Sequence, residues 1–117
     1  MEFSIEFYAT KTGNCPVEDF FDEMKEQDAK DYATVMAKLD KLKYKSNHHE
    51  PLTKSIGNGL LELRHVGRLN TRVIWFYVKG RRIIAVHGIR NKAKKIRKQE
   101  LEIALSRKID WVKRNAS

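Results

Sequence analysis

The sequence predicts an α+β fold in a single domain covering residues 1–117, with its elements in the order β-α-α-β-β-β-α. A strand-like alternation of apolar residues opens the chain, two amphipathic helical segments follow, and three strand-like runs precede a final helix. No repeat, low-complexity tract or linker interrupts this series, and 117 residues suffice to bury a core without disulfide or metal staples. We therefore expect a mainly antiparallel sheet with a helical hairpin packed on it.

The first half of the chain predicts one strand and the helical hairpin. Apolar side chains occupy alternate positions in residues 2–9, as in a half-buried strand. Pro16 suits the first turn of a helix, and the acidic residues just after it favour a helix start at this point. Residues 28–46 carry apolar side chains at the three-and-four spacing of a second helix. The polar, glycine-containing residues 47–59 predict a loop.

The second half predicts three strands joined by tight turns, and then a helix. The strand-like runs are LLELRH at 60–65, LNTRVIWFYV at 69–78 and RRIIAVHGI at 81–89. Gly67 and Gly80 stand at the joins, which favours two antiparallel hairpins. The middle run is apolar at both odd and even positions, which is typical of a central strand covered on both faces. Residues 97–114 show the apolar stripe of a closing helix.

The positive charge of the chain belongs to its second half. Residues 1–59 contain 8 Lys and Arg against 11 Asp and Glu, a net charge of −3, whereas residues 60–117 contain 16 against 4, a net charge of +12. So uneven a distribution attracts polyanions and accelerates their encounter with the protein. Nucleic acid is therefore the leading class of partner, and a highly soluble surface without such a partner is the alternative.

Several classes of site lack their motifs in this sequence. Neither the G-x-S-x-G nucleophile elbow nor the phosphate-binding G-x-x-x-x-G-K-[ST] loop occurs. Cys15 is the single cysteine, which fits a reducing compartment and marks no nucleophile. The adjacent His48, His49 and Glu50 lack the further ligands of a tetrahedral metal site. With no basic signal region at the start, we expect a cytoplasmic protein that needs neither metal, cofactor nor membrane.

The predicted hairpins bring basic residues together on one face of the sheet. A two-residue turn at residues 79–80 would place Arg72 directly opposite His87, whereas a three-residue turn would separate them. A three-residue loop at residues 66–68 would place Arg64 diagonally beside Arg72. We therefore expect two arginines, and with the shorter turn also the histidine, to be close neighbours.

Arg72 needs a partner, because an unpaired charge among the apolar residues of a central strand is costly. One possibility is an ion pair with a carboxylate such as Glu62. The other is a hollow in which Arg64, Arg72 and the lysines after Gly88 bind phosphate oxygens. Nearby arginines would lower the pKa of His87 and favour a neutral base, although a hydrogen-bonded core histidine is the alternative. Such a set suits metal-free RNA cleavage, which needs a proton acceptor, a proton donor and positive charge for the transition state.

The run LLELRHVGRLNTRVIWFYVKGRRIIAVHGIRNKAKK resembles the HigB-type, phage-related toxins of the RelE/ParE superfamily. The most specific matches are the triplet ELR at 62–64, the RVI that begins at Arg72, and His87-Gly88 leading into lysines. The resemblance covers nearly the whole chain. It implies a RelE-like fold and a bacterial toxin that cleaves mRNA on the ribosome. It also implies a cognate antitoxin, a helix-turn-helix, HigA-like protein, that keeps the toxin silent.

On this basis the sequence predicts the toxin of a type II toxin–antitoxin system, acting as a metal-independent, ribosome-dependent mRNA endoribonuclease. The predicted catalytic residues are Arg64, Arg72, His87, Lys92 and Lys95, with His87 as the candidate for proton transfer. The predicted additional RNA or phosphate contacts are Arg68, Arg90, Lys94, Arg97 and Lys98. The alternatives are a gyrase-targeting, ParE-like toxin on the same scaffold and a non-catalytic RNA-binding or phage structural protein.

Overall fold

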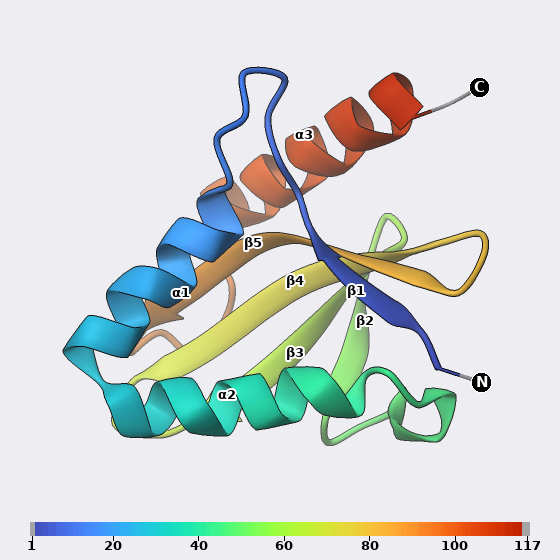
Figure 1. Cartoon of the computed structure of the whole chain (residues 1–117). Coiled ribbons are helices and arrows are strands. Elements are labelled where there is room, and N and C mark those ends of the chain that lie inside the picture. The colour runs from blue at the N-terminus through green and yellow to red at the C-terminus, as the bar shows by residue number, and fades with distance from the viewer. Residues whose placement is uncertain (1, 116–117) are drawn as a thin grey trace.

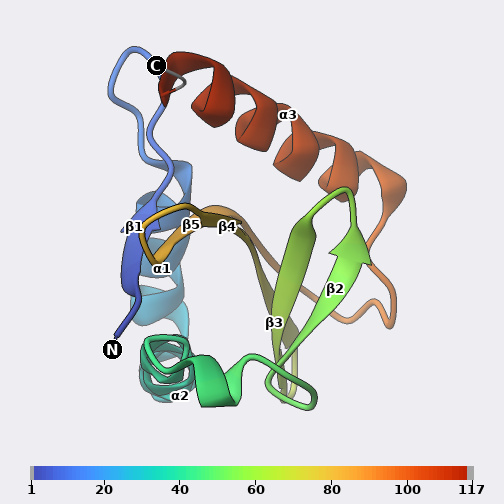
Figure 2. The same ribbon diagram turned by 90° about the vertical axis from the view of Figure 1, so that its right-hand side faces the viewer.

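A five-stranded sheet with helices on both faces forms the body of the protein, as shown by a computed structural model that describes residues 2–115 (Figure 1). The elements in chain order are β1 (Ser4–Phe7), α1 (Pro16–Gln27), α2 (Ala29–Lys41), the 3₁₀ turn η1 (Lys45–Asn47), β2 (Thr53–Gly57), β3 (Leu60–Val66), β4 (Asn70–Val78), β5 (Arg82–Asn91) and α3 (Lys98–Asn115). Figure 2 shows α1 and α2 on one side of the sheet and α3 on the other. None of these helices is long and apolar enough to cross a membrane.

The strands lie in the order β1-β5-β4-β3-β2, with β1 parallel to β5 and every other pair antiparallel. The predicted fold class, with a mainly antiparallel sheet and a helical hairpin on one face, is therefore confirmed. The residues from Val73 to Phe76 in β4 are buried on both faces, as their apolar pattern predicts. One core lies between the sheet and the helical hairpin, and a second lies between the sheet and α3.

The prediction of a loop over residues 47–59 was wrong, because this segment contains β2. Thr53–Gly57 pairs with β3, and the two-residue turn between them holds Asn58 and Gly59 at positive φ angles of 56° and 73°. Both turn residues are therefore in the left-handed region that an Asn-Gly hairpin turn uses. The strand is mostly polar because it lies at the edge of the sheet. The Oγ1 of Thr53 donates to the carbonyl of Glu62, which ties β2 to β3.

The second helix ends at Lys41 rather than at residue 46. Side chains of the following residues form hydrogen bonds with the carbonyl groups at the end of the helix. The Nδ2 of Asn47 donates to the carbonyl of Lys41, and the Nε2 of His48 bonds the carbonyl of Leu42. The other ring nitrogen of His48 bonds the hydroxyl of Tyr77. Carbonyls left unpaired at the end of a helix are satisfied in this way, and the two ring nitrogens of His48 link the end of α2 to Tyr77 of β4.

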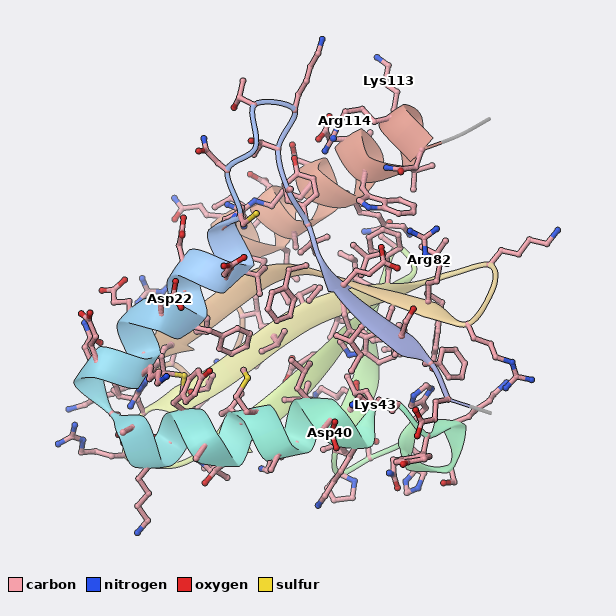
Figure 3. All side chains as sticks on the ribbon, viewed as in Figure 1. Asp22, Asp40, Lys43, Arg82, Lys113 and Arg114 are labelled. Carbon is pink, nitrogen blue, oxygen red and sulfur yellow. The ribbon has the colours of Figure 1, made fainter. Side chains whose placement is uncertain are left out.

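Polar contacts at the C-terminal end of α3 hold this helix over the sheet. The hydroxyl of Tyr8 donates to Asp110 at 2.6 Å, and Arg114 donates both to Asp110 and to the carbonyl of Ala9. Figure 3 shows Arg114 and Arg82 on this side of the molecule, where the guanidinium of Arg82 stacks over the ring of Trp111. These contacts hold the C-terminal end of α3 against the residues that follow β1 and against β5.

Gly88 permits the close approach of α1 to the sheet. A Cβ atom at Gly88 would overlap the ring of Phe20. Gly88 does not have a positive φ, so the lack of space is what excludes a larger residue here. We expect Gly88→Ala to lower the free energy of unfolding by about 1–3 kcal/mol, the usual cost of overpacking. Denaturant unfolding measures this change. The double variant with Phe20→Leu should recover part of the loss, and an unchanged stability of Gly88→Ala would contradict the close packing.

Candidate functional site

A buried ion-pair cluster lies on the sheet face that α3 partly covers. The register of β3 and β4 places Arg64 opposite Arg72, and Glu62 points to the same face two residues earlier. The Nε of Arg64 donates to the Oε1 of Glu62 at 2.8 Å, and the Nε of Arg72 lies 3.7 Å from the same oxygen. Glu62 and Arg72 are only 2% and 1% exposed, whereas the side chain of Arg64 is 36% exposed. One buried carboxylate therefore holds two guanidinium groups side by side.

Arg72 connects this cluster to the basic segment that follows β5. Its Nη2 donates to the carbonyl of Lys94 at 2.7 Å, which fixes the 92–97 segment against the sheet. Among residues 2–115, the buried Nη1 of Arg72 has no hydrogen-bond partner. Burial lowers the pKa of Arg72, the carboxylate of Glu62 opposes this shift, and the nearby charge of Arg64 adds to it. The predicted ion pair of Arg72 with Glu62 is present, and the same guanidinium also positions the lysine segment.

Above the cluster lies a hollow of about 440 Å³, which we call the basic hollow. Its lining residues are Lys54, Ile56, Glu62, Arg64, Lys94, Lys95, Ile96 and Leu101. Three separate segments, β2, β3 and the 92–97 loop, thus contribute positive charge to one concave surface. The side chains of Lys54, Lys94 and Lys95 are exposed, and Arg64 is half-buried at the floor. Convergent cations of this kind bind phosphate oxygens, and an arginine can do so with two nitrogens at once.

Lys54 and Glu62 were missing from the predicted site residues. Lys54 pairs with Glu62 across β2 and β3, and it was overlooked because its strand was predicted as a loop. The signal that could have found it is the Asn58-Gly59 dipeptide, which favours a two-residue hairpin turn directly before a strand-like run. With β2 in place, the alternation along the strand assigns Lys54 to a definite face of the sheet.

The structure separates His87 from Arg72, contrary to the register of a two-residue turn. The turn after β4 holds three residues, because Val78 pairs with Arg82, and Gly80 and Arg81 both have positive φ. A bulge lies further from this turn, between the pair Trp75–Ala85 and the pair Ile74–His87. Arg72 consequently lies opposite Ile89. Turn length and a bulge decide this register, and neither is visible in the apolar pattern.

His87 makes its own hydrogen bonds to α3. One ring nitrogen bonds the carboxylate of Glu100, and the other lies 2.9 Å from the Nη1 of Arg107. Burial lowers the pKa of His87, the charge of Arg107 lowers it further, and Glu100 opposes both. Its side chain lines a different hollow of about 410 Å³ between α1, β5 and α3, together with Phe20. His87 therefore connects β5 to the first half of α3, and it is not among the residues that line the basic hollow.

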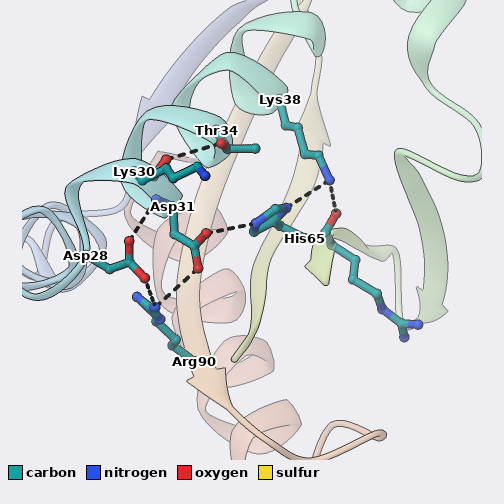
Figure 4. A network of polar contacts seen from close by, with 8 residues as sticks. Asp28, Lys30, Asp31, Thr34, Lys38, His65 and Arg90 are labelled. Atoms are coloured by element: carbon teal, nitrogen blue, oxygen red, sulfur yellow. Dashed lines mark hydrogen bonds and ion pairs between the residues drawn. The ribbon is translucent and has the colours of Figure 1, made fainter. Parts of the chain in front are cut away.

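Arg90 also lies apart from the basic hollow. Its Nη2 donates to Asp28 at 3.0 Å and to Asp31 at 3.3 Å, and the side chain is only 6% exposed. Figure 4 shows these two carboxylates at the start of α2 and the guanidinium of Arg90 between them. Arg90 thus joins the last strand to the helical hairpin on the opposite face of the sheet from the second core.

The remaining predicted site residues, one catalytic and three phosphate-binding, are exposed. Lys92, Arg97 and Lys98 lie in or beside the 92–97 segment, and none of them lines the basic hollow. Arg68 is exposed in the turn between β3 and β4. Of the ten predicted residues, the structure therefore brings four together at the basic hollow: Arg64 and the two lysines in its lining, and Arg72 beneath them.

Comparison with known proteins assigns the chain to a family. A family model described as Phage derived protein Gp49-like (DUF891) matches residues 22–108. The chain belongs to this Gp49-like family. The Gp49-like family is a RelE/HigB-like toxin family that is associated with the toxins of toxin–antitoxin systems. The superfamily to which the sequence resemblance pointed is thereby confirmed, and the matched range includes every residue that lines the basic hollow. No curated protein matches the chain.

Proposed function

We propose that this Gp49-like protein is the toxin of a type II toxin–antitoxin system and cleaves mRNA on the ribosome as a metal-independent endoribonuclease. The observation that carries the proposal is the convergence of Lys54, Arg64, Lys94 and Lys95 on one hollow, above a buried Arg72–Glu62 ion pair. A single-stranded RNA backbone is the polyanion that fits such a hollow. The toxin character of the family supports the same conclusion.

The proposed reaction is attack of a ribose 2′-oxygen on the adjacent phosphorus, with departure of the 5′-oxygen. Glu62 holds the Nε of Arg64, which leaves the two terminal nitrogens of that guanidinium free to grip the phosphate as its negative charge grows. The 2′-hydroxyl loses its proton to water as the 2′-oxygen attacks, and a lysine of the hollow donates a proton to the leaving 5′-oxygen. The products are a 2′,3′-cyclic phosphate and a 5′-hydroxyl end. His87 takes no part, because it lies in another hollow.

In this proposal the partners are the ribosome with its mRNA and a cognate antitoxin, a helix-turn-helix, HigA-like protein. The site of action is the cytoplasm, where translating ribosomes are found. Expression of the protein alone should arrest growth and shorten mRNA, and co-expression of an antitoxin from an adjoining reading frame should restore growth.

Incubation of the purified protein with translating ribosomes tests the activity directly. New mRNA ends with 5′-hydroxyl groups are expected, and they should persist when a chelator is present. Lys95→Ala should reduce their number, whereas Lys92→Ala serves as the matched control because Lys92 is an exposed neighbour outside the hollow. In cells that express the protein alone, intact mRNA together with damaged chromosomal DNA would contradict the nuclease proposal and support the gyrase-targeting alternative.

Salt dependence provides a second test of the basic hollow. The logarithm of the binding constant for single-stranded RNA should fall with the logarithm of the salt concentration, with a slope of about −0.7 for each phosphate contacted. Lys95→Ala should make this slope shallower by about one contact, and Lys92→Ala should leave it unchanged. Fluorescence anisotropy over a range of salt concentrations measures the slope. A slope near zero in the parent protein would contradict phosphate binding.

A further inference from the structure

A second hollow of about 400 Å³ adjoins the basic hollow at the edge of the sheet, and we call it the edge hollow. The two hollows share Lys54, Glu62 and Arg64, so they meet at the side chain of Arg64. Their volumes are similar, and both fall within the range of about 300–1,000 Å³ that is usual for sites of small organic ligands. The surface is therefore hollowed on both sides of a single arginine.

The edge hollow differs from the basic hollow in its lining. Beyond the shared residues its lining consists of the apolar Pro51, Leu52 and Val66 and the polar or charged Lys38, Glu50 and Thr53. Val66 is 68% exposed at the end of β3. Lys38 and Lys54 contribute positive charge to the same surface. An apolar surface flanked by cations suits a nucleotide, whose base is flat and apolar and whose phosphate is anionic. The guanidinium of Arg64 at the border can also stack on a base.

Lys38 is held in place by contacts that cross from α2 to β3. Its Nζ donates to the carbonyl of Arg64 at 3.3 Å and lies 3.2 Å from the Nδ1 of His65. The other ring nitrogen of His65 lies 3.3 Å from Asp31, which also accepts a hydrogen bond from Arg90. Figure 4 shows this series of contacts from Arg90 to Lys38. A cation that is already fixed loses less side-chain entropy when an anion binds.

We propose that the edge hollow binds the nucleotide next to the one whose phosphate is held in the basic hollow. The two hollows then take successive nucleotides of one RNA strand, with Arg64 between them. This inference rests on the proposed function, because it names a second subsite for the same substrate. It predicts that a base bound in the edge hollow, outside the basic hollow, adds to the free energy of RNA binding.

The test measures the affinity for a fluorescein-labelled, 2′-O-methylated heptanucleotide, which cannot be cleaved by 2′-oxygen attack. Val66→Glu introduces a negative charge into the edge hollow at an exposed position, and Val112→Glu is the matched control, on the outside of α3 and 45% exposed. Val66→Glu should weaken binding about tenfold, within the range for losing one stacked base. Val112→Glu should leave binding unchanged. Lys95→Ala reports separately on the basic hollow.

A second pair of variants keeps the test valid if Val66→Glu fails to fold. Lys38→Met removes the charge but keeps most of the side-chain bulk, and Lys30→Met is its control on the exposed surface of the same helix. Lys38→Met should weaken binding and Lys30→Met should not. Unchanged binding in folded Val66→Glu and Lys38→Met, with weakened binding in Lys95→Ala, would overturn this inference alone. A parent protein that binds no RNA, or binds as well after Lys95→Ala, would overturn the proposed function also.

Discussion

Arg72→Ala is expected to lower mRNA cleavage by about 10²-fold or more and to lower the free energy of unfolding by about 3 kcal/mol. Both effects arise from the same guanidinium. Its removal takes away the hydrogen bond that fixes the carbonyl of Lys94, so the lysine segment is no longer held over the hollow. It also leaves the buried carboxylate of Glu62 with Arg64 as its one charged partner in the cluster. Thermal or denaturant unfolding and ribosome cleavage assays measure the two effects.

A variant of similar stability separates the two effects of Arg72. Gly88→Ala should also lose stability, but Gly88 lines a different hollow and makes no contact with the lysine segment that the structure records. Cleavage is therefore compared at a temperature where both variants are folded. If Arg72→Ala loses no more activity than Gly88→Ala, the arginine serves only stability. A stable and fully active Arg72→Ala protein would contradict both roles.

The apolar pattern predicted the strands that build the core, because burial on one or both faces leaves a clear periodicity. The residues around Trp75 form a continuous apolar run and lie at the centre of the sheet. β2 left no such pattern, because Lys54, Ser55 and Gly57 are exposed and its one buried side chain is that of Thr53, a polar residue. β2 is held by backbone hydrogen bonds to β3, and the propensities of its own residues do not predict this pairing. This is why Lys54 was missed.

The candidate site was predictable in its chemistry but only partly in its geometry. The density of positive charge after Gly88 and the arginines of β3 and β4 indicated phosphate binding, and the structure brings Arg64 and Lys95 to one hollow. The placement of His87 depended on the number of residues in one turn. The sequence left a two-residue and a three-residue turn open, and the longer one forms, with Arg81 at a positive φ of 58° that few non-glycine residues adopt. Arg90 is paired with Asp28 and Asp31 at the start of α2. The sequence does not predict this long-range pairing, so Arg90 was assigned to the site.

Arg64→Ala is expected to lower cleavage by about 10²-fold while the protein stays folded. The side chain is 36% exposed, so its loss should cost about 1 kcal/mol of stability, much less than the loss of buried Arg72. Because Glu62 holds the Nε of Arg64, the terminal nitrogens are already directed for the phosphate. An interaction of this kind that forms in the transition state should be lost from kcat and kcat/KM equally.

Two further variants test whether the shape or only the charge of Arg64 matters. Arg64→Lys keeps the positive charge but lacks the planar fork, and it should restore only a small part of the activity. Arg68→Ala removes another arginine, one that is exposed in the neighbouring turn, and it should leave kcat unchanged. If Arg64→Ala raised KM without lowering kcat, the arginine would bind the RNA equally in its ground and transition states. Full activity in Arg64→Ala would leave Lys54, Lys94 and Lys95 as the groups that stabilise the reacting phosphate, because these are the remaining cations that line the basic hollow.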